Sequence, residues 1–125
     1  MISAQVKGIF TWEGERLELH VPQDPQKFCV LVRIMVGPRG GEGEESFDIN
    51  VCTPRWLEEQ VEREGFVFGT HRLFVKTYDS VQIKNLITKF IERYSGDSWR
   101  EVAEKISRMA RWEFEDYKPT PQSEQ

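Results

Sequence analysis

GPRGGEGEESFDINVCTPRWL, residues 37–57, is the stretch of sequence that decides the fold. Its second half alternates apolar and polar side chains from Phe47 to Cys52, which is the period-two pattern of a half-buried strand. Thr53 then supplies a hydroxyl that caps a helix, and Pro54 suits the first helical position, where no N–H donor is needed. The stretch therefore predicts a strand that leads directly into a helix.

The glycine-rich first half, residues 37–46, is an acidic loop. Ten residues are more than a tight hairpin turn needs. They carry Glu42, Glu44 and Glu45 on a flexible glycine backbone. Because long loops between well-formed strands often carry function, this loop is a candidate functional segment.

The strongest strand pattern lies just before this loop, in residues 28–36. It is expected to pair antiparallel with residues 46–52. With Val36 opposite Phe47, three apolar pairs share one face of the hairpin. That face is predicted to be core.

The other face of the hairpin is partly polar. The same register places Arg33 opposite Asn50 and diagonal to Asp48. It also places Cys29 diagonal to Cys52, where a disulfide is possible. A chain with this much apolar sequence does not need one.

Periodicity predicts a first strand in residues 2–10, with Ile2, Ala4, Val6, Gly8 and Phe10 on one face. Residues 11–26 contain a glycine and two prolines, so they form a long connection. One helical turn is expected there, around Glu15–Leu19.

The first helix covers residues 54–64 and ends at Gly65, with Leu57 and Val61 on its inward side. Strand pieces follow at residues 66–68 and 72–76. They are separated by a bulge or turn.

Two capping patterns mark the later helices. Asp79 with Gln82 opens the second helix, which ends at Gly96, and Ser98 with Glu101 opens the third. The inner seam of the third helix consists of Val102, Ile106, Met109 and Ala110.

Strands come early and helices late, which predicts an α+β fold. We expect an antiparallel sheet of about four strands with three helices packed mainly on one face. A chain of 125 residues with 38% hydrophobic content is sufficient for one domain. The predicted domain covers residues 1–118, and residues 119–125 form a polar tail.

The negative charge is concentrated in one segment. Residues 42–64 hold eight acidic and two basic residues, a net charge of −6, whereas the whole chain carries −4. Such a surface repels nucleic acid and attracts a basic protein. No signal peptide or membrane-spanning run is visible, and two cysteines do not form a disulfide framework, so we expect a cytoplasmic protein with neither nucleic-acid nor membrane partners.

No catalytic or cofactor motif stands out. The glycine run does not precede a helix and lacks a following GK[ST], so it is not a phosphate-binding loop. His20 and His71 have no Cys or His neighbours at metal-ligand spacing. The expectation is a protein without a metal, a cofactor or enzymatic activity.

Three motifs suggest a family. They are the VPQDP approach at residues 21–25, the turn and strand GPRGGEGEESFD at 37–48, and the helix start VCTPRWL at 51–57. The chain resembles the immunity protein 8 family of bacterial polymorphic toxin systems across roughly residues 20–60. The resemblance implies a small non-enzymatic protein that binds and neutralises a cognate toxin domain. A basic toxin such as a nuclease would suit the acidic segment.

The predicted partner-binding surface combines the acidic loop, the first helix and a tryptophan that is either core-packed or an interface anchor. We expect a monomer or weak dimer. Its predicted contact residues are Glu42, Glu44, Glu45, Asp48, Arg55, Trp56, Glu58, Glu59 and Glu62.

Two alternatives stay open from the residues alone. One is a small enzyme or ligand-binding domain with a polar pocket on the second sheet face, formed by Arg33, Asp48 and Asn50. The other is an assembly module that dimerises through an exposed sheet edge.

Overall fold

The computed structural model describes residues 1–114. The predicted domain end at residue 118 and the predicted tail at 119–125 lie outside the described residues. The helices and strands, in chain order, are β1 (Ile2–Thr11), β2 (Cys29–Pro38), β3 (Glu45–Cys52), α1 (Pro54–Glu64), β4 (Arg72–Phe74), α2 (Ser80–Ile91), β5 (Ser95–Gly96), α3 (Trp99–Ile106) and β6 (Arg111–Trp112).

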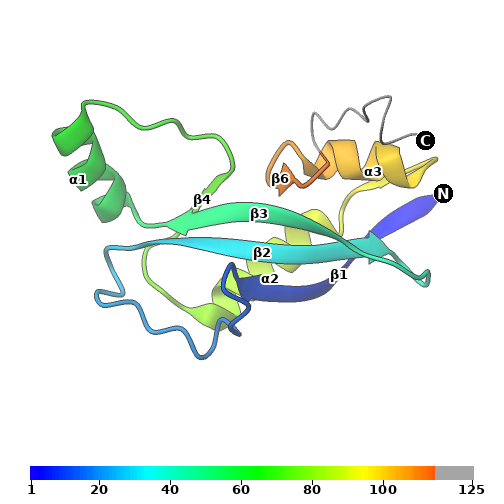
Figure 1. Ribbon diagram of the computed structural model, residues 1–125, viewed down its shortest axis with the longest axis horizontal. Coiled ribbons are helices and arrows are strands. Elements are labelled where there is room, and N and C mark those ends of the chain that lie inside the picture. Colours follow the sequence, from blue (N-terminus) through cyan, green and yellow to red (C-terminus); the bar gives the residue numbers. More distant parts are fainter. Residues whose placement is uncertain (115–125) are drawn as a thin grey trace, which may run out of the picture.

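These elements form an α+β fold, which confirms the predicted class. The six-stranded sheet has the order β4-β3-β2-β1-β5, with β6 also paired to β3 (Figure 1). The expectation of about four antiparallel strands was slightly off, because β4 pairs parallel with β3 and makes the sheet mixed. The chain leaves β3, forms α1 and returns along the same edge in the same direction, which is the connection that parallel pairing requires.

The register of the β2–β3 hairpin differs from the prediction by two residues. Ile34, not Val36, lies opposite Phe47. A two-residue shift keeps every side chain on its predicted face, so the apolar pattern could not distinguish the two registers. The two sides of the β2–β3 turn come close together at Gly37. A side chain would not fit there, because a Cβ would lie 2.1 Å from the carbonyl oxygen of Gly43.

The shifted register also changes the neighbours on the second face. Arg33 lies directly opposite Asp48, not Asn50. Cys29 lies directly opposite Cys52 rather than diagonal to it.

Strand β1 contains a bulge that the sequence pattern did not reveal. Its pairing with β2 shifts between Val6 and Gly8. Beyond that point the two faces exchange, so Ile9 is buried while Phe10 is not. The prediction that Gly8 and Phe10 share a face with Ala4 and Val6 was therefore wrong, because one extra residue reverses the alternation.

Helix α1 has the predicted bounds but not the predicted burial. Thr53 caps its start, and Gly65 ends it in the left-handed conformation with φ +88°. The helix contributes no buried residue, and Val61 is 40% exposed, so the expected inward side of Leu57 and Val61 does not form. Because only Thr53 separates α1 from β3, the helix begins at the end of the sheet and extends away from it (Figure 1).

Helix α2 starts as predicted, with the Asp79 carboxylate accepting a hydrogen bond from the Gln82 N–H at 3.1 Å. Its buried face consists of Ile83, Ile87 and Ile91. The helix ends at Ile91, well before the predicted end at Gly96. The chain instead uses residues 95–96 to pair with the beginning of β1.

Helix α3 also has the predicted start, where Ser98 Oγ accepts from the Glu101 N–H at 3.1 Å. Val102, Ile106 and Ala110 are fully buried, as expected, and Met109 packs against the same core. The helix itself ends at Ile106, and Met109 and Ala110 lie in the turn that leads to β6.

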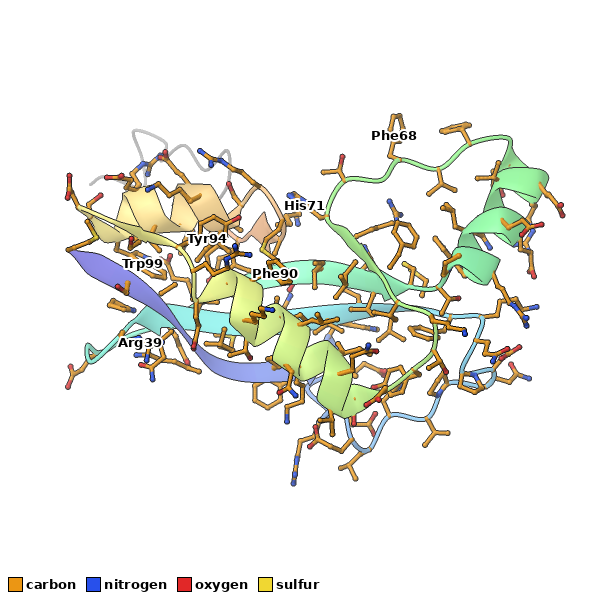
Figure 2. The ribbon with its side chains drawn as sticks, turned by 180° about the vertical axis from the view of Figure 1, so that it is seen from behind. Arg39, Phe68, His71, Phe90, Tyr94 and Trp99 are labelled. Atoms are coloured by element: carbon orange, nitrogen blue, oxygen red, sulfur yellow. The ribbon has the colours of Figure 1, made fainter. Side chains whose placement is uncertain are left out.

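The core lies between the sheet and the helices α2 and α3. Figure 2, seen from behind, shows α2 crossing the sheet. Leu17 joins this core from the long first connection, where Arg16 makes a β-bridge with Phe10. In place of a full helical turn, residues 17–19 form a turn in which the N–H groups of Leu19 and His20 donate to the carbonyl oxygens of Arg16 and Leu17. The hydroxyl of Tyr78 donates to the carbonyl oxygen of Leu17 at 2.7 Å and fixes that connection to the segment before α2.

Candidate functional site

Apart from Asp48, which lies within β3, the predicted partner-binding residues fall into two groups at opposite ends of that strand. Residues 42–45 lie at the β2–β3 turn, and residues 55–62 lie on α1 beyond the other end of the strand (Figure 1). Since a strand rises about 3.4 Å per residue, the eight residues of β3 separate the two groups by roughly 25 Å. The segment with a net charge of −6 therefore does not form one continuous acidic surface.

The acidic turn presents two unpaired carboxylates. Glu42 and Glu44 are exposed and have no hydrogen-bond or ion-pair partner among the described residues. The turn is held by Lys7, the extra residue of the β1 bulge, whose ammonium group donates to the carbonyl oxygens of Gly41 at 2.7 Å and Gly43 at 3.1 Å. The bulge thus positions the loop that carries these two carboxylates.

Glu45 has a role in the fold. One oxygen of its carboxylate, Oε1, accepts hydrogen bonds from the indole N–H groups of Trp99 at 2.7 Å and Trp112 at 3.0 Å. These bonds join the start of β3 to α3 and β6, and Trp112 stacks on the buried ring of Phe47. A half-buried carboxylate that already accepts two indole donors is poorly placed to contact a partner.

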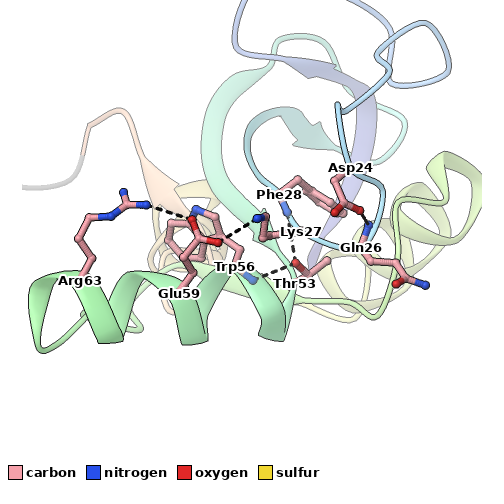
Figure 3. Close-up of polar contacts among 8 residues, drawn as sticks. All are labelled: Asp24, Gln26, Lys27, Phe28, Thr53, Trp56, Glu59 and Arg63. Carbon is pink, nitrogen blue, oxygen red and sulfur yellow. Dashed lines mark hydrogen bonds and ion pairs between the residues drawn. The ribbon is translucent and has the colours of Figure 1, made fainter.

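The root of α1 is fixed by a buried threonine. Thr53 Oγ1 accepts from the Trp56 N–H at 3.3 Å and from the Phe28 N–H at 3.2 Å (Figure 3). The first bond caps α1, and the second ties it to the residue before β2. The same hydroxyl therefore starts the helix and attaches it to the sheet.

Glu59 is neutralised within the molecule. Its carboxylate lies 2.9 Å from Lys27 Nζ and 3.0 Å from Arg63 Nη2 (Figure 3). The hydrogen bond and the charge of Lys27, followed by the charge of Arg63, lower the pKa of Glu59. In return, Glu59 raises the pKa of Lys27.

Glu58 and Glu62 are the unpaired acids of α1 among the predicted residues. Both are exposed, and neither has a partner within residues 1–114. They lie four residues apart, so they share one helix face and their negative charges reinforce each other. Arg55 is also exposed and unpaired in the described part, one turn before Glu58.

Trp56 is half-buried, so it is neither a core residue nor a fully exposed interface anchor. The guanidinium carbon of Arg72 lies 5.7 Å from the centre of its ring. Arg72 also donates through Nη1 to the carbonyl oxygen of Phe68. Trp56 therefore connects α1 to the segment that leads into β4.

Two exposed phenylalanines follow α1, and sequence reasoning assigned them to a strand. Phe66 is 64% exposed and Phe68 is 76% exposed, and no strand forms at residues 66–68. Their rings meet edge to face with centroids 5.7 Å apart, and Phe68 points away from the body of the molecule (Figure 2). Two large apolar side chains in water beside an acidic helix are a feature of interaction surfaces. Their position directly after the helix stop at Gly65 is the signal that could have identified them.

We define the α1 surface as Arg55, Glu58, Glu62, Phe66 and Phe68. It combines negative charge with exposed aromatic rings. Arg55, Glu58 and Glu62 lie on α1, which buries none of its side chains, and the two phenylalanines follow the end of that helix.

The second sheet face holds an ion pair beside a shallow hollow. Arg33 and Asp48 form two hydrogen bonds of 2.9 and 3.0 Å. The hydrogen bond and the charge of Asp48 raise the pKa of Arg33. The hollow has a volume of about 310 Å³ and is lined by Leu31, Asp48, Asn50, Thr70, His71, Arg72 and Arg111.

Two of the polar side chains that line this hollow already have partners in the fold. Asp48 is already paired, and His71 Nε2 lies 2.7 Å from the carbonyl oxygen of Ser107, which joins the start of β4 to the end of α3. Within residues 1–114, no group of three or more His, Cys, Asp or Glu side chains is placed to hold a metal ion. No helix in the same part of the chain has both the length and the apolar character needed to cross a membrane.

Exposed acids on a projecting helix, without partners in residues 1–114, and two exposed aromatic rings just after that helix are features of a surface that binds another protein. The family model for immunity protein 8 matches residues 4–117, so the chain belongs to the immunity protein 8 family. That family implies a toxin partner and a non-enzymatic role. Searches among curated proteins and among solved structures gave no match.

Proposed function

We propose that this protein binds a cognate bacterial toxin domain through the α1 surface and neutralises it by covering the region that the toxin needs for its activity. The observation that supports this most is that Glu58 and Glu62 are exposed without a partner in residues 1–114, and that the exposed Phe66 and Phe68 follow the same helix. Aromatic side chains supply contact area, and unpaired charges speed encounter with a partner of opposite sign.

The predicted contact residues have different roles in this proposal. Glu58 and Glu62 contact the toxin, with Arg55 at the rim. Trp56 and Glu59 hold the surface in place through Arg72 and Lys27. Glu45 and Asp48 stabilise the sheet, and Glu42 and Glu44 form a separate acidic site at the opposite turn.

The toxin that fits this surface has a basic face with an apolar recess, as a nuclease has around its substrate site. Basic nucleases bind phosphates with Lys and Arg, and an acidic protein competes for those side chains. In this proposal the protein acts in the cytoplasm, as a monomer or weak dimer, without catalysis or a cofactor.

The test measures how two variants of this protein, each with two reversed charges, bind the toxin domain encoded beside its gene. Glu58→Lys with Glu62→Lys changes the α1 surface, and Glu42→Lys with Glu44→Lys changes the acidic turn. Calorimetry should show at least about tenfold weaker binding, or 1.4 kcal/mol, for the first pair and little change for the second. The association rate of the first pair should also lose its salt dependence.

The two pairs also decide between the two acidic groups. If the turn variant loses affinity and the α1 variant does not, the toxin binds at the turn. If both variants bind and protect as the natural protein does, neither acidic group contributes to recognition.

A further inference from the structure

We propose that Cys29 and Cys52 are a redox-active dithiol, which closes a cross-strand disulfide at the root of α1 by exchange with a low-molecular-weight disulfide. The proposal does not depend on the toxin or on the α1 surface.

The first support is the position of the two residues. Cys29 begins β2, Cys52 ends β3, and they pair directly across the antiparallel ladder. Opposed residues in such a ladder have Cα atoms about 4.5–5.5 Å apart, which lies within the roughly 4.4–6.8 Å that a disulfide needs. The sulfurs are already in contact, with Sγ of Cys52 2.9 Å from Sγ of Cys29.

The second support is the difference in exposure between the two thiols. Cys52 is fully buried, whereas Cys29 is partly exposed. A reagent from solution therefore meets Cys29 first. Such a pair has one thiol placed to attack and one placed behind it to resolve the product.

The electrostatic surroundings favour the same assignment. The hydrogen bond from Cys52 is the main cause that lowers the pKa of Cys29, and the positive charge of Arg72 acts in the same direction. The same hydrogen bond, together with burial, raises the pKa of Cys52. Cys29 is thus the thiol more readily converted to the reactive thiolate.

Arg72 is an unusual cation at this position. No carboxylate in residues 1–114 pairs with it, and its Nε is buried without a hydrogen-bond partner. Its guanidinium is held over Trp56 instead. A positive charge that no carboxylate of residues 1–114 neutralises stabilises a thiolate near it, which gives this side chain a role beyond packing.

The chemistry balances with a small disulfide as the oxidant. The Cys29 thiolate attacks one sulfur of the reagent, forms a mixed disulfide and releases one small thiolate. Cys52 then gives up its proton to solvent and attacks the Cys29 sulfur, which releases the second small thiolate. The protein loses two protons and two electrons, and the reagent is reduced to two thiols.

The disulfide would lie next to the bond that attaches α1 to the sheet. Cys52 precedes Thr53, and Cys29 follows Phe28, whose N–H donates to the Thr53 hydroxyl. Oxidation would therefore add a covalent link between the same two segments. We expect slower amide exchange in α1 and a thermal midpoint higher by about 5–15 °C.

The first experiment treats the folded protein with oxidised glutathione and measures intact mass and free thiols. The expected product has no free thiol, a mass lower by about 2 Da, and a Cys29–Cys52 link in the peptide map that dithiothreitol reverses. A wild-type protein that stops at a stable glutathione adduct, or that reacts only after urea unfolding, would overturn the proposal.

Variants then separate the two thiols. Cys52→Ser should stop at a glutathione adduct on Cys29, and Cys29→Ser should react at least tenfold more slowly because Cys52 is buried. Arg72→Gln should slow the adduct formation several-fold at neutral pH and recover the natural rate at high pH, an effect that loss of packing alone does not produce. Equal rates for Cys29→Ser and Cys52→Ser would refute the assignment of roles.

Discussion

Replacing Glu45 tests whether this carboxylate stabilises the fold through its hydrogen bonds to two tryptophans. It was predicted to contact a partner. In the structure, one oxygen of its carboxylate accepts hydrogen bonds from the indole N–H groups of Trp99 and Trp112. Glu45→Ala should therefore destabilise the fold, whereas Glu44→Ala, one residue away and unpaired, should not.

The size of the effect follows from the two bonds. A hydrogen bond to a charged group contributes about 1.5–3 kcal/mol, and two bonds to one oxygen contribute less than twice that. Because Glu45 is only half-buried, water replaces part of the loss. We expect Glu45→Ala to lower the free energy of unfolding by about 2–4 kcal/mol, or the thermal midpoint by about 8–16 °C. Glu45→Gln keeps an acceptor oxygen and should lose about half as much.

The assay is urea unfolding followed by tryptophan fluorescence and by circular dichroism. The fluorescence of the native state should also change in Glu45→Ala, because the two affected side chains are themselves the probes. Equal unfolding midpoints for Glu45→Ala and Glu44→Ala would refute the reasoning. A stable Glu45→Ala protein that loses toxin binding would instead restore the predicted contact role.

Three further predictions concern the turn and α1. Gly65→Ala should cost about 1–2 kcal/mol in thermal unfolding, because alanine is strained at φ +88° while nothing obstructs its side chain. Gly37→Ala should lower the free energy of unfolding by about 1–3 kcal/mol, because its Cβ would collide with the Gly43 carbonyl oxygen. It should also alter the NMR shifts of residues 38–44. Unchanged shifts would contradict the close approach of Gly37 and Gly43. Lys27→Met should raise the pKa of Glu59, measured by carboxyl NMR titration, since Lys27 is the main cause of its lowering. In the natural protein the stabilising contribution of Glu59 is complete above the pKa of an unfolded glutamate and is lost as the pH falls through its lower folded value; an unchanged titration in Lys27→Met would show that the ion pair does not persist in solution.

The candidate site was only partly predictable from the sequence. The acids and Arg55 were identified because charge is visible residue by residue. Phe66 and Phe68 were missed because alternation around Val67 is equally consistent with a strand, and only the path of the chain after Gly65 leaves both rings in water. Whether a carboxylate is already paired, as in Glu45 and Glu59, depends on residues distant in the sequence.

Local chemistry determined the starts of the helices and the faces of the hairpin. The caps at Thr53, Asp79 and Ser98 act within three residues of the groups that they bind, so the sequence alone predicts them. Alternation likewise predicted which side chains of β2 and β3 face the core.

Tertiary structure alone decided the register, the β1 bulge, the parallel pairing of β4 and the separation of the two acidic groups. These features depend on contacts between residues far apart in the chain. A period-two pattern has the same faces after a two-residue shift, so it cannot choose the pairing that places Cys29 opposite Cys52. The pairing depends instead on tertiary contacts. These are the close approach of Gly37 and Gly43 in the turn and the packing of the sheet against α2 and α3.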